Sequence, residues 1–319
     1  MQTYLGLDGG GTKTAALIMD VDGRVLGEGT GGPGNVAHNP ASVLSRSIQD
    51  ACSSASAAAA AGNTTIYTAI CAGIAGYSVS DKRNEFEQLL RQEVAAEHYR
   101  IEPDYLIAYW GATHGDPGIV VVAGTGAVAF GRNESGVTYR ADGLGYLLGD
   151  RGSGFDLGLY ALRYTLQLME EGRTDELSSS VVAHTGASRQ TEIVQWLYGN
   201  FNPARVASLS PVVGALAESG DVAARNLTSE MARRLRHTVR DVRHKLWLPR
   251  DTPVYPLGRL WLLGEFFRSE FAEPSWPGGN GVTMAQEPAT GGHFNLVEPK
   301  NDAAYGAALL ARAIDSTIS

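Results

Sequence analysis

The sequence predicts an α/β protein made of two similar domains. Its first half alternates apolar strand segments with helical segments, the pattern of sheets covered by helices. A glycine-rich loop followed by a hairpin turn occurs twice with one spacing: Thr12 and Thr125 lie 113 residues apart, and so do Gly23 and Gly136. This weak repeat predicts two domains that each open with a β-hairpin whose loop faces a shared cleft. A chance alignment of glycine turns is the alternative explanation.

Composition limits the kind of protein that the chain can be. With 319 residues, 44% hydrophobic and 19% charged, it should fold into two domains of ordinary size. A net charge of −8 argues against a broad nucleic-acid surface. We find no signal peptide and no apolar run of the ~18 residues that suggests a membrane span, so we expect a cytoplasmic location and no membrane partner. Cys52 and Cys71 are expected to be buried thiols.

The predicted strands are short apolar runs bounded by turn residues. In the first half they are Leu5–Asp8, Thr14–Met19, a third strand beginning at Arg24–Gly27, Ile66–Ala72, Arg100–Glu102, Ile119–Val122 and Ala127–Gly131. Three helices lie between them, each with helical apolar spacing or high alanine content: Asn39–Ala61, Asp81–Ala96 and Tyr105–His114.

The second half is predicted to be mostly helical. Its helices show apolar residues at helical spacing: Gly154–Glu171, Thr191–Tyr198, Pro203–Ala217, Val222–Lys245, Leu262–Phe271 and Asp302–Ile314. One strand, Val254–Leu257, leads to Gly258, and Glu273–Gly292 is expected to be an irregular loop. We place the domains at residues 1–114 and 115–301, and the C-terminal helix near 302–319 can belong to the first of them.

The segment Asp8–Thr14 is the strongest chemical signal. An acid ends the first strand and three glycines follow it, so backbone N–H groups can approach a ligand closely. Asp8 is placed to meet a hydrated Mg²⁺. Together with Gly124–Gly126 and the turn at Gly258, this loop forms a set suited to phosphate, and nearby carboxylates could hold a metal or take a proton. A glycine-rich hairpin without a ligand is the alternative.

Ordered motifs from residue 4 to about residue 312 carry a family resemblance. They are Gly6–Thr14, Asn35 in Gly32–Asn35, Gly73–Gly76, Asp104 with Ile107–Ala112, Pro117–Gly126, Gly145–Gly154 and Gly306–Ala311. In these motifs the chain resembles the N-acetylglucosamine kinase family and its BadF/BadG/BcrA/BcrD-type ATPase relatives, within the actin/hexokinase/Hsp70 superfamily.

The resemblance implies both a fold and a reaction. The fold would be two ribonuclease-H-like, actin-like ATPase domains with an interdomain cleft that holds ATP and Mg²⁺ and closes on the sugar. The reaction would be ATP-dependent phosphorylation of a hydroxyl of an amino sugar, such as N-acetylglucosamine, glucosamine or a related sugar. The implied partner is therefore a small-molecule sugar and no nucleic acid, and a homodimer is a family-level expectation.

The same resemblance assigns a role to each matching position. Asp104 would be the general base and Asp8 would lie at the metal. The nucleotide would be bound by Gly10, Gly11, Thr12, Lys13, Thr14, Thr125, Gly126 and Gly258. The sugar would be bound by Asn35, Gly76, Asp104, Thr125, Gly145 and Asp150.

Several of these residues have a purely structural alternative. Asp104 and Asp150 could cap the turns that follow them, and Asn35 in its Gly/Pro loop could support its own backbone. Lys13 lacks the spacing of a P-loop lysine and could be a solvated or structural residue.

Four positions depart from the family pattern. Arg151 stands where the family usually has Glu, Leu144 where a tryptophan is common, Arg259 where a second glycine is usual, and Tyr105 where a small residue is usual. These changes keep open a second hypothesis, a non-catalytic sugar or nucleotide sensor. A third hypothesis, an activator ATPase of the dehydratase type, needs cluster cysteines that Cys52 and Cys71 do not match.

Overall fold

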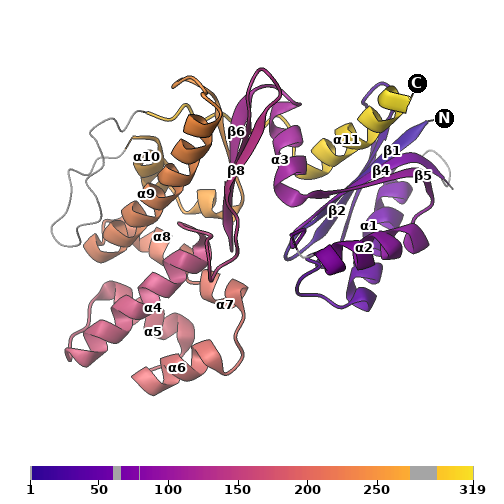
Figure 1. Ribbon diagram of the computed structural model, residues 1–319. Coiled ribbons are helices and arrows are strands. Elements are labelled where there is room, and N and C mark those ends of the chain that lie inside the picture. The colour runs from indigo at the N-terminus through magenta and orange to yellow at the C-terminus, as the bar shows by residue number, and fades with distance from the viewer. Residues whose placement is uncertain (1, 60–65, 79, 274–292, 319) are drawn as a thin grey trace. The chain divides into compact units, whose positions relative to one another are not determined.

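A computed structural model describes residues 2–59, 66–78, 80–273 and 293–318. The chain divides into two compact units, unit 1 (Met1–Asp116 with Glu298–Ser319) and unit 2 (Pro117–Val297), and each contains one β-sheet (Figure 1). The irregular loop expected over Glu273–Gly292 lies outside the described residues, apart from Glu273.

Unit 1 is built on a five-stranded sheet in the order β3-β2-β1-β4-β5. Its strands are β1 (Thr3–Gly9), β2 (Thr14–Asp20), β3 (Val25–Gly31), β4 (Tyr67–Ile74) and β5 (Ala96–Pro103). The first three strands are antiparallel neighbours, whereas β4 and β5 run parallel to β1. The chain therefore delivers the ends of β1, β4 and β5 to the same edge of the sheet.

Alternation along β1 divides the core of unit 1 into two layers. Leu5 and Leu7 pack toward helices α1 (Ala41–Ala58) and α2 (Ser80–Glu93). Tyr4 packs on the other face, toward α3 (Asp104–Thr113) and α11 (Ala303–Ile318). Figure 1 shows these two helix pairs on opposite faces of the sheet. Because successive strand residues point to opposite faces, Gly6 and Asp8 lie on the face that α3 and α11 cover.

Alternate glycines determine how β3 packs. A Cβ built on Gly27, Gly29 or Gly31 would lie within 2.2 Å of backbone carbonyl oxygens of α1. Glycine at every second position thus lets the helix backbone rest directly on the strand. The sequence predicted where this strand begins but not where it ends, because glycine-rich segments have low strand propensity.

Unit 2 repeats the strand arrangement of unit 1 in a four-stranded sheet, β8-β7-β6-β9. Its strands are β6 (Gly118–Ala123), β7 (Ala127–Arg132), β8 (Thr138–Asp142) and β9 (Val254–Leu257). Again three antiparallel neighbours are followed by a parallel strand, and Leu296 adds a parallel bridge to Val254. This shared order supports the repeat that the glycine loops suggested.

Helices cover the sheet of unit 2 and fill its core. They are α4 (Gly154–Glu170), α5 (Glu176–Thr185), α6 (Gln190–Tyr198), α7 (Pro203–Ala207), α8 (Ser210–Ser219), α9 (Val222–Lys245), the 3₁₀ helix η1 (Arg259–Leu262) and α10 (Glu265–Ala272). The single helix predicted over Pro203–Ala217 is wrong, because the chain breaks it at Ser208 and Leu209. Helix α5 was missed since serine and β-branched residues dominate it.

Two further expectations concern buried thiols and membrane spans. Cys71 is buried in β4 and Cys52 is partly buried in α1, as expected for structural thiols. In the part of the chain that the structure describes, no helix has the length and apolar character needed to cross a bilayer.

Gly6→Ala tests the close contact between β1 and α11. A Cβ at Gly6 would lie 2.2 Å from the Ala304 carbonyl oxygen and 2.4 Å from the Ala308 nitrogen, so sheet and helix must separate. We expect the free energy of unfolding to fall by about 2–3 kcal/mol. Urea denaturation followed by circular dichroism measures it. Gly11→Ala, where a Cβ meets nothing within 4 Å, is the control and should change stability by less than about 0.5 kcal/mol. Equal midpoints for both variants would contradict the close packing.

Candidate active site

In unit 1, the predicted site residues gather at the carboxyl ends of the parallel strands. Strand β1 ends at Gly9 beside the end of β4, and β4 ends at Ile74 beside Pro103 of β5. Loops that follow these ends are hydrogen-bonded to one another: Ala75 N–H donates to the Gly9 carbonyl at 3.1 Å, and Val36 N–H donates to the Ala75 carbonyl at 3.2 Å. The sheet therefore brings together segments that are up to 95 residues apart in sequence, since it places Asp104 near Gly9.

The glycine loop presents unbonded backbone donors at its tip. The Gly10 N–H donates to the Lys13 carbonyl at 3.0 Å and closes the turn. Gly11, Thr12 and Lys13 are exposed, and within the described part of the chain no hydrogen bond is found for the N–H groups of Gly11 and Thr12. Thr14 differs from them because its side chain is buried against Gly34. The tip can thus donate to an anion, while the Gly10 N–H and the Thr14 hydroxyl face the protein.

Asn35 and Gly76 lie next to each other beside this loop. The Asn35 Oδ1 accepts the Ala37 N–H at 2.9 Å, so this side chain does support its own turn. A Cβ on Gly76, whose φ is +88°, would lie 3.2 Å from that Oδ1. Among the described residues, the Asn35 amide nitrogen has no hydrogen-bond acceptor, so it can donate to a ligand.

Asp8 is a carboxylate whose charge the protein does not compensate. In the part of the chain that the structure describes, it accepts no hydrogen bond. Burial, followed by the negative charges of Asp104 and Asp302, raises the pKa of Asp8 to about 7, and Lys13 offsets only part of this rise. Such a group is poised to bind a cation or to keep a proton.

Asp302 is a residue that sequence reasoning missed. It directly precedes α11, and its Oδ1 accepts the Tyr305 N–H at 2.9 Å. Helix α11 crosses β1 at Gly6, two residues before Asp8 on the same face. In the sequence, Asp302 looked only like the start of a helix, and no local pattern links it to Asp8.

Asp104 is the first residue of α3 and not its N-cap, a position that Pro103 occupies. One oxygen of its carboxylate, Oδ1, accepts the Tyr105 N–H at 2.8 Å. A carboxylate in the first turn of a helix is stabilised by the helix dipole. The structure therefore holds Asp104 at the carboxyl end of β5, and only Oδ1 takes part in the bond to the Tyr105 N–H.

In unit 2, Thr125, Gly126 and Gly258 lie at the carboxyl ends of the parallel strands β6 and β9. Thr125 is exposed, and among the described residues its N–H and that of Gly126 have no hydrogen-bond acceptor. The Gly154 N–H donates to the Gly124 carbonyl at 2.8 Å and fixes the loop to α4. Gly258 has a φ of +98°, and a Cβ there would lie 2.3 Å from the Ala123 carbonyl oxygen.

Asp150 lies against the second glycine loop. A Cβ on Gly126 would come within 2.6 Å of the Asp150 Oδ2, so only glycine leaves room for this carboxylate. Burial, with smaller effects from Asp142 and Asp156, raises the pKa of Asp150 to about 6, although the Ala127 and Gly145 backbone N–H groups donate to it. Asp150 has a φ of +55° and lies before α4, whose N-cap is Ser153, so it is not the cap of that helix.

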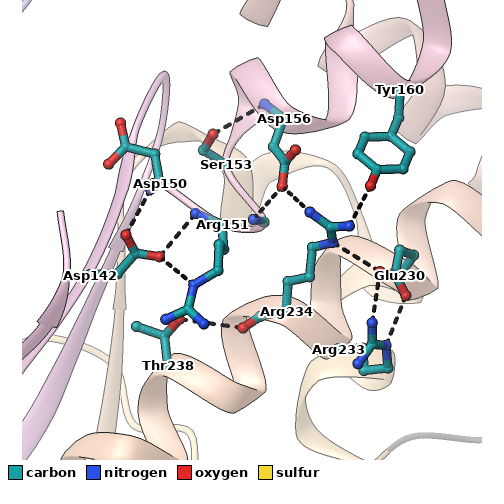
Figure 2. A network of polar contacts seen from close by, with 11 residues as sticks. Asp142, Asp150, Arg151, Ser153, Asp156, Tyr160, Glu230, Arg233, Arg234 and Thr238 are labelled. Atoms are coloured by element: carbon teal, nitrogen blue, oxygen red, sulfur yellow. Dashed lines mark hydrogen bonds and ion pairs between the residues drawn. The ribbon is translucent and has the colours of Figure 1, made fainter. Parts of the chain in front are cut away.

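Asp142, which the sequence analysis also missed, anchors the segment that contains Asp150. Its side chain is 1% exposed, its Oδ1 accepts the Asp150 N–H at 2.7 Å, and its Oδ2 accepts the Arg151 N–H and Nε, each at 3.0 Å. Figure 2 shows the Arg151 side chain running away from the Asp150 carboxylate. The positive charge of Arg151, which departs from the family pattern, is therefore paired with the Asp142 carboxylate and does not lie beside the Asp150 carboxylate.

A second anchor follows directly after Arg151. The Gly152 N–H donates to the Asp156 Oδ2 at 2.9 Å. The Arg234 guanidinium of α9 bonds to the same oxygen at 3.1 Å (Figure 2). Arg234 also donates to Tyr160 and Glu230. The segment 149–153 is thus held at both ends by buried or partly buried ion pairs.

Comparisons with known proteins identify a family and several relatives. The family described as BadF/BadG/BcrA/BcrD ATPase family matches residues 5–311. An N-acetylmuramic acid/N-acetylglucosamine kinase of Clostridium acetobutylicum is 26% identical, over 98% of this chain and 99% of that protein. An N-acetyl-D-glucosamine kinase of Dictyostelium discoideum is 27% identical, over 78% of this chain and 82% of that protein.

A solved structure from Chromobacterium violaceum is similar in fold. N-acetylglucosamine kinase activity has been assigned to that protein provisionally, and the two chains share 24% identity with a TM-score of 0.78, over 98% of this chain and 99% of that one. The expected α/β class with two ribonuclease-H-like domains of the actin-like ATPase type is confirmed.

Asp150→Asn tests the electrostatic state of this carboxylate. Since its folded-state pKa of about 6 lies above the ordinary 3.8, ionisation of Asp150 destabilises the folded state above pH 6, and this cost vanishes below pH 4. We expect the variant to be more stable than the wild type by about 1 kcal/mol at pH 8 and equal to it at pH 4, after discounting for partial exposure. Thermal unfolding at both pH values measures this.

The exposed Asp241→Asn serves as the matched control and should leave the unfolding temperature unchanged at both pH values. A variant at position 150 that loses stability at pH 8 would contradict the electrostatic argument.

Proposed function

The chain belongs to the BadF/BadG/BcrA/BcrD ATPase family, and from this premise we propose that it is an ATP-dependent kinase that phosphorylates a hydroxyl of an amino sugar without a carboxylate. The observation that carries the proposal is the edge of the unit 1 sheet, where Asp8 and Asp104 flank a loop with unbonded N–H donors. Phosphoryl transfer needs little beyond this: positioning, charge neutralisation and a group that takes a proton.

The glycine loop is proposed to bind the phosphates of ATP. Exposed N–H groups at Gly11 and Thr12 suit phosphate oxygens, and the Lys13 ammonium adds a positive charge at the tip. Thr125 and Gly126 offer a second pair of donors in unit 2. We assign Gly258, which follows β9, to the nucleotide as well.

Asp8 fits a magnesium ion. Its uncompensated charge, with Asp104 and Asp302 nearby, favours a cation. No group of three metal-ligating side chains is present among the described residues, which agrees with Mg²⁺ because this ion is usually held by one or two carboxylates together with substrate phosphates. When bound, Mg²⁺ would neutralise charge on the phosphate oxygens.

Asp104 is proposed as the general base. The sugar hydroxyl attacks the γ-phosphorus and its proton passes to the Asp104 carboxylate. A bond forms between the sugar oxygen and phosphorus, the bond from phosphorus to the β–γ bridging oxygen breaks, and ADP is released. The Tyr105 N–H at 2.8 Å keeps one oxygen of Asp104 fixed, which orients the carboxylate for the transfer.

The residues proposed to bind sugar hydroxyls are assigned in each unit by itself. In unit 1 they are Asn35, through its amide nitrogen, and the Gly76 backbone. In unit 2 they are Gly145 and the Asp150 carboxylate. A small-molecule sugar is accordingly the proposed partner. A homodimer and a cytoplasmic location stay predictions from the sequence.

The charge around Asp150 favours a sugar without a carboxylate over an acidic sugar. Arg151 is the cation closest to Asp150 in sequence, and its Nε is committed to Asp142. Although Asp142 and Asp156 are paired with Arg151 and Arg234, both acids raise the pKa of Asp150, so the surroundings of Asp150 disfavour a further negative charge. A sugar carboxylate would be repelled there, which argues for N-acetylglucosamine or glucosamine.

The two other hypotheses gain no support. The sensor hypothesis was based on several departures from the family pattern, and one of them, Arg151, pairs with Asp142 and so adds no unpaired charge beside Asp150. The activator hypothesis needs thiolates for a cluster, but burial raises the pKa of Cys52 to about 12 and raises that of Cys71 as well.

Asp104→Asn tests the proposed reaction. Wild-type protein with ATP, Mg²⁺ and N-acetylglucosamine, glucosamine, N-acetylmuramic acid or glucose should release ADP, fastest with N-acetylglucosamine or glucosamine. The variant should lose at least ~100-fold in kcat because the proton has no acceptor, while the Kd for ATP changes less than about twofold. A coupled ADP assay and calorimetry measure the two quantities.

Glu97→Gln is the matched control, since Glu97 is an exposed acid on β5, the strand that leads to Asp104. Its kcat should equal that of the wild type. Wild-type protein that releases no ADP above background with any sugar of the panel would refute the kinase proposal.

A further inference from the structure

Asp142 is a buried carboxylate that accepts hydrogen bonds from one short segment, Asp150 and Arg151. It ends β8 with a φ of +65°, and Gly143 follows with a φ of +71°. Its carboxylate accepts three N–H groups, all from Asp150 and Arg151. A buried carboxylate with three donors is well satisfied, so its contacts are costly to break.

The close approach of Asp142 requires glycine in the segment it holds. A Cβ on Gly149 would lie 2.2 Å from the Asp142 Oδ1. The bond between Oδ1 and the Asp150 N–H, at 2.7 Å, forms just after this glycine. Asp142 and Gly149 therefore act together to bring the backbone at Asp150 down onto β8.

This contact stabilises an uncommon backbone conformation at Asp150. A φ of +55° is left-handed and rare for residues other than glycine, asparagine and aspartate. Rotation of Asp150 to an ordinary φ would turn its N–H away from Asp142. The same rotation would also remove the Asp150 carboxylate from the N–H groups of Ala127 and Gly145 and from the surface of Gly126. The backbone bond thus determines where the carboxylate lies.

Arg151 lowers the free-energy cost of burying the charged Asp142 carboxylate. Its Nε lies 3.0 Å from the Asp142 Oδ2, and one Nη lies 4.0 Å from the exposed Asp241. A glutamate at position 151, which the family resemblance leads one to expect, would meet Asp142 as a like charge. Arginine at 151 is therefore matched to aspartate at 142.

We propose that Asp142 and Arg151 form a positioning pair that holds the Asp150 carboxylate in place for the sugar hydroxyls. This inference rests on the proposed function, in which Asp150 binds the sugar. Neither member of the pair needs to touch the substrate, because both act through the backbone of Asp150. The pair also gives the departure from the family pattern at position 151 a role in sugar binding.

Asp142→Asn and Arg151→Gln test the pair. Each should raise the KM for the sugar at least tenfold, lower kcat less than threefold, and leave the KM for ATP within twofold. Arg151→Lys, which keeps the charge but loses the Nε donor, should fall between Arg151→Gln and the wild type. The double variant should have the same sugar KM as the worse single variant, since both changes release the same segment.

Asp241→Asn is the control on the same arginine and should keep the wild-type sugar KM. If Asp142→Asn does not fold, Arg151→Gln carries the same test, because the Arg151 side chain is 49% exposed. Wild-type sugar KM in Arg151→Gln, or equal rises in the KM for sugar and for ATP, would overturn the proposal.

A crystal structure of Arg151→Gln gives a readout that does not depend on activity. We expect Asp150 to leave the left-handed region and its carboxylate to leave Gly126; an unchanged Asp150 would overturn the positioning role. If the wild type phosphorylates no sugar, the proposed function fails, while this structure still decides whether the pair positions Asp150.

Discussion

Contact between backbone segments, without side chains between them, is the constraint on which the structure depends. In unit 1, α11 rests on Gly6 of β1 and α1 rests on the glycines of β3. A contact of the same kind joins the segment containing Asn35 to the end of β1, since a Cβ on Gly34 would lie 2.5 Å from the Cα of Gly9. Because helices sit this close to the sheet, the first residues of α3 and the residue before α11 reach the strand ends. Asp104 and Asp302 thereby come near Asp8.

Unit 2 uses the same constraint for its own carboxylates. Gly126 leaves room for the Asp150 carboxylate, Gly149 for that of Asp142, and Gly258 for the end of β6. The two units share their strand order, yet they place their acids differently. In unit 1 the acids follow strands or precede helices, whereas in unit 2 Asp150 sits in a connecting loop. The repeat therefore supplies two glycine loops, and the segments between the strands supply the carboxylates near them.

The sequence predicted those features of the fold that local sequence patterns control. Strands β1, β6 and β9, helix α9 and both glycine loops follow from apolar spacing and from turn residues, and the ordered motifs led to the family. What it could not predict depends on long-range packing. Asp302 lies 294 residues from Asp8, and Asp142 is followed by a glycine, so it looked like an ordinary turn residue. The role of Arg151 could not be predicted for the same reason, because its partner was unknown.

Hydrogen bonding separates the carboxylates that hold the structure from those that are free to act. Asp142 accepts three N–H groups, one of them from the paired cation Arg151, and its side chain is 1% exposed, so it serves the structure. Asp8 accepts no hydrogen bond within the described part of the chain and keeps a pKa of about 7, and Asp150 is intermediate at about 6. Ionisation of such groups destabilises the folded state. Their position beside loops with unbonded N–H groups is the physical reason to expect that these loops and carboxylates bind charged ligands.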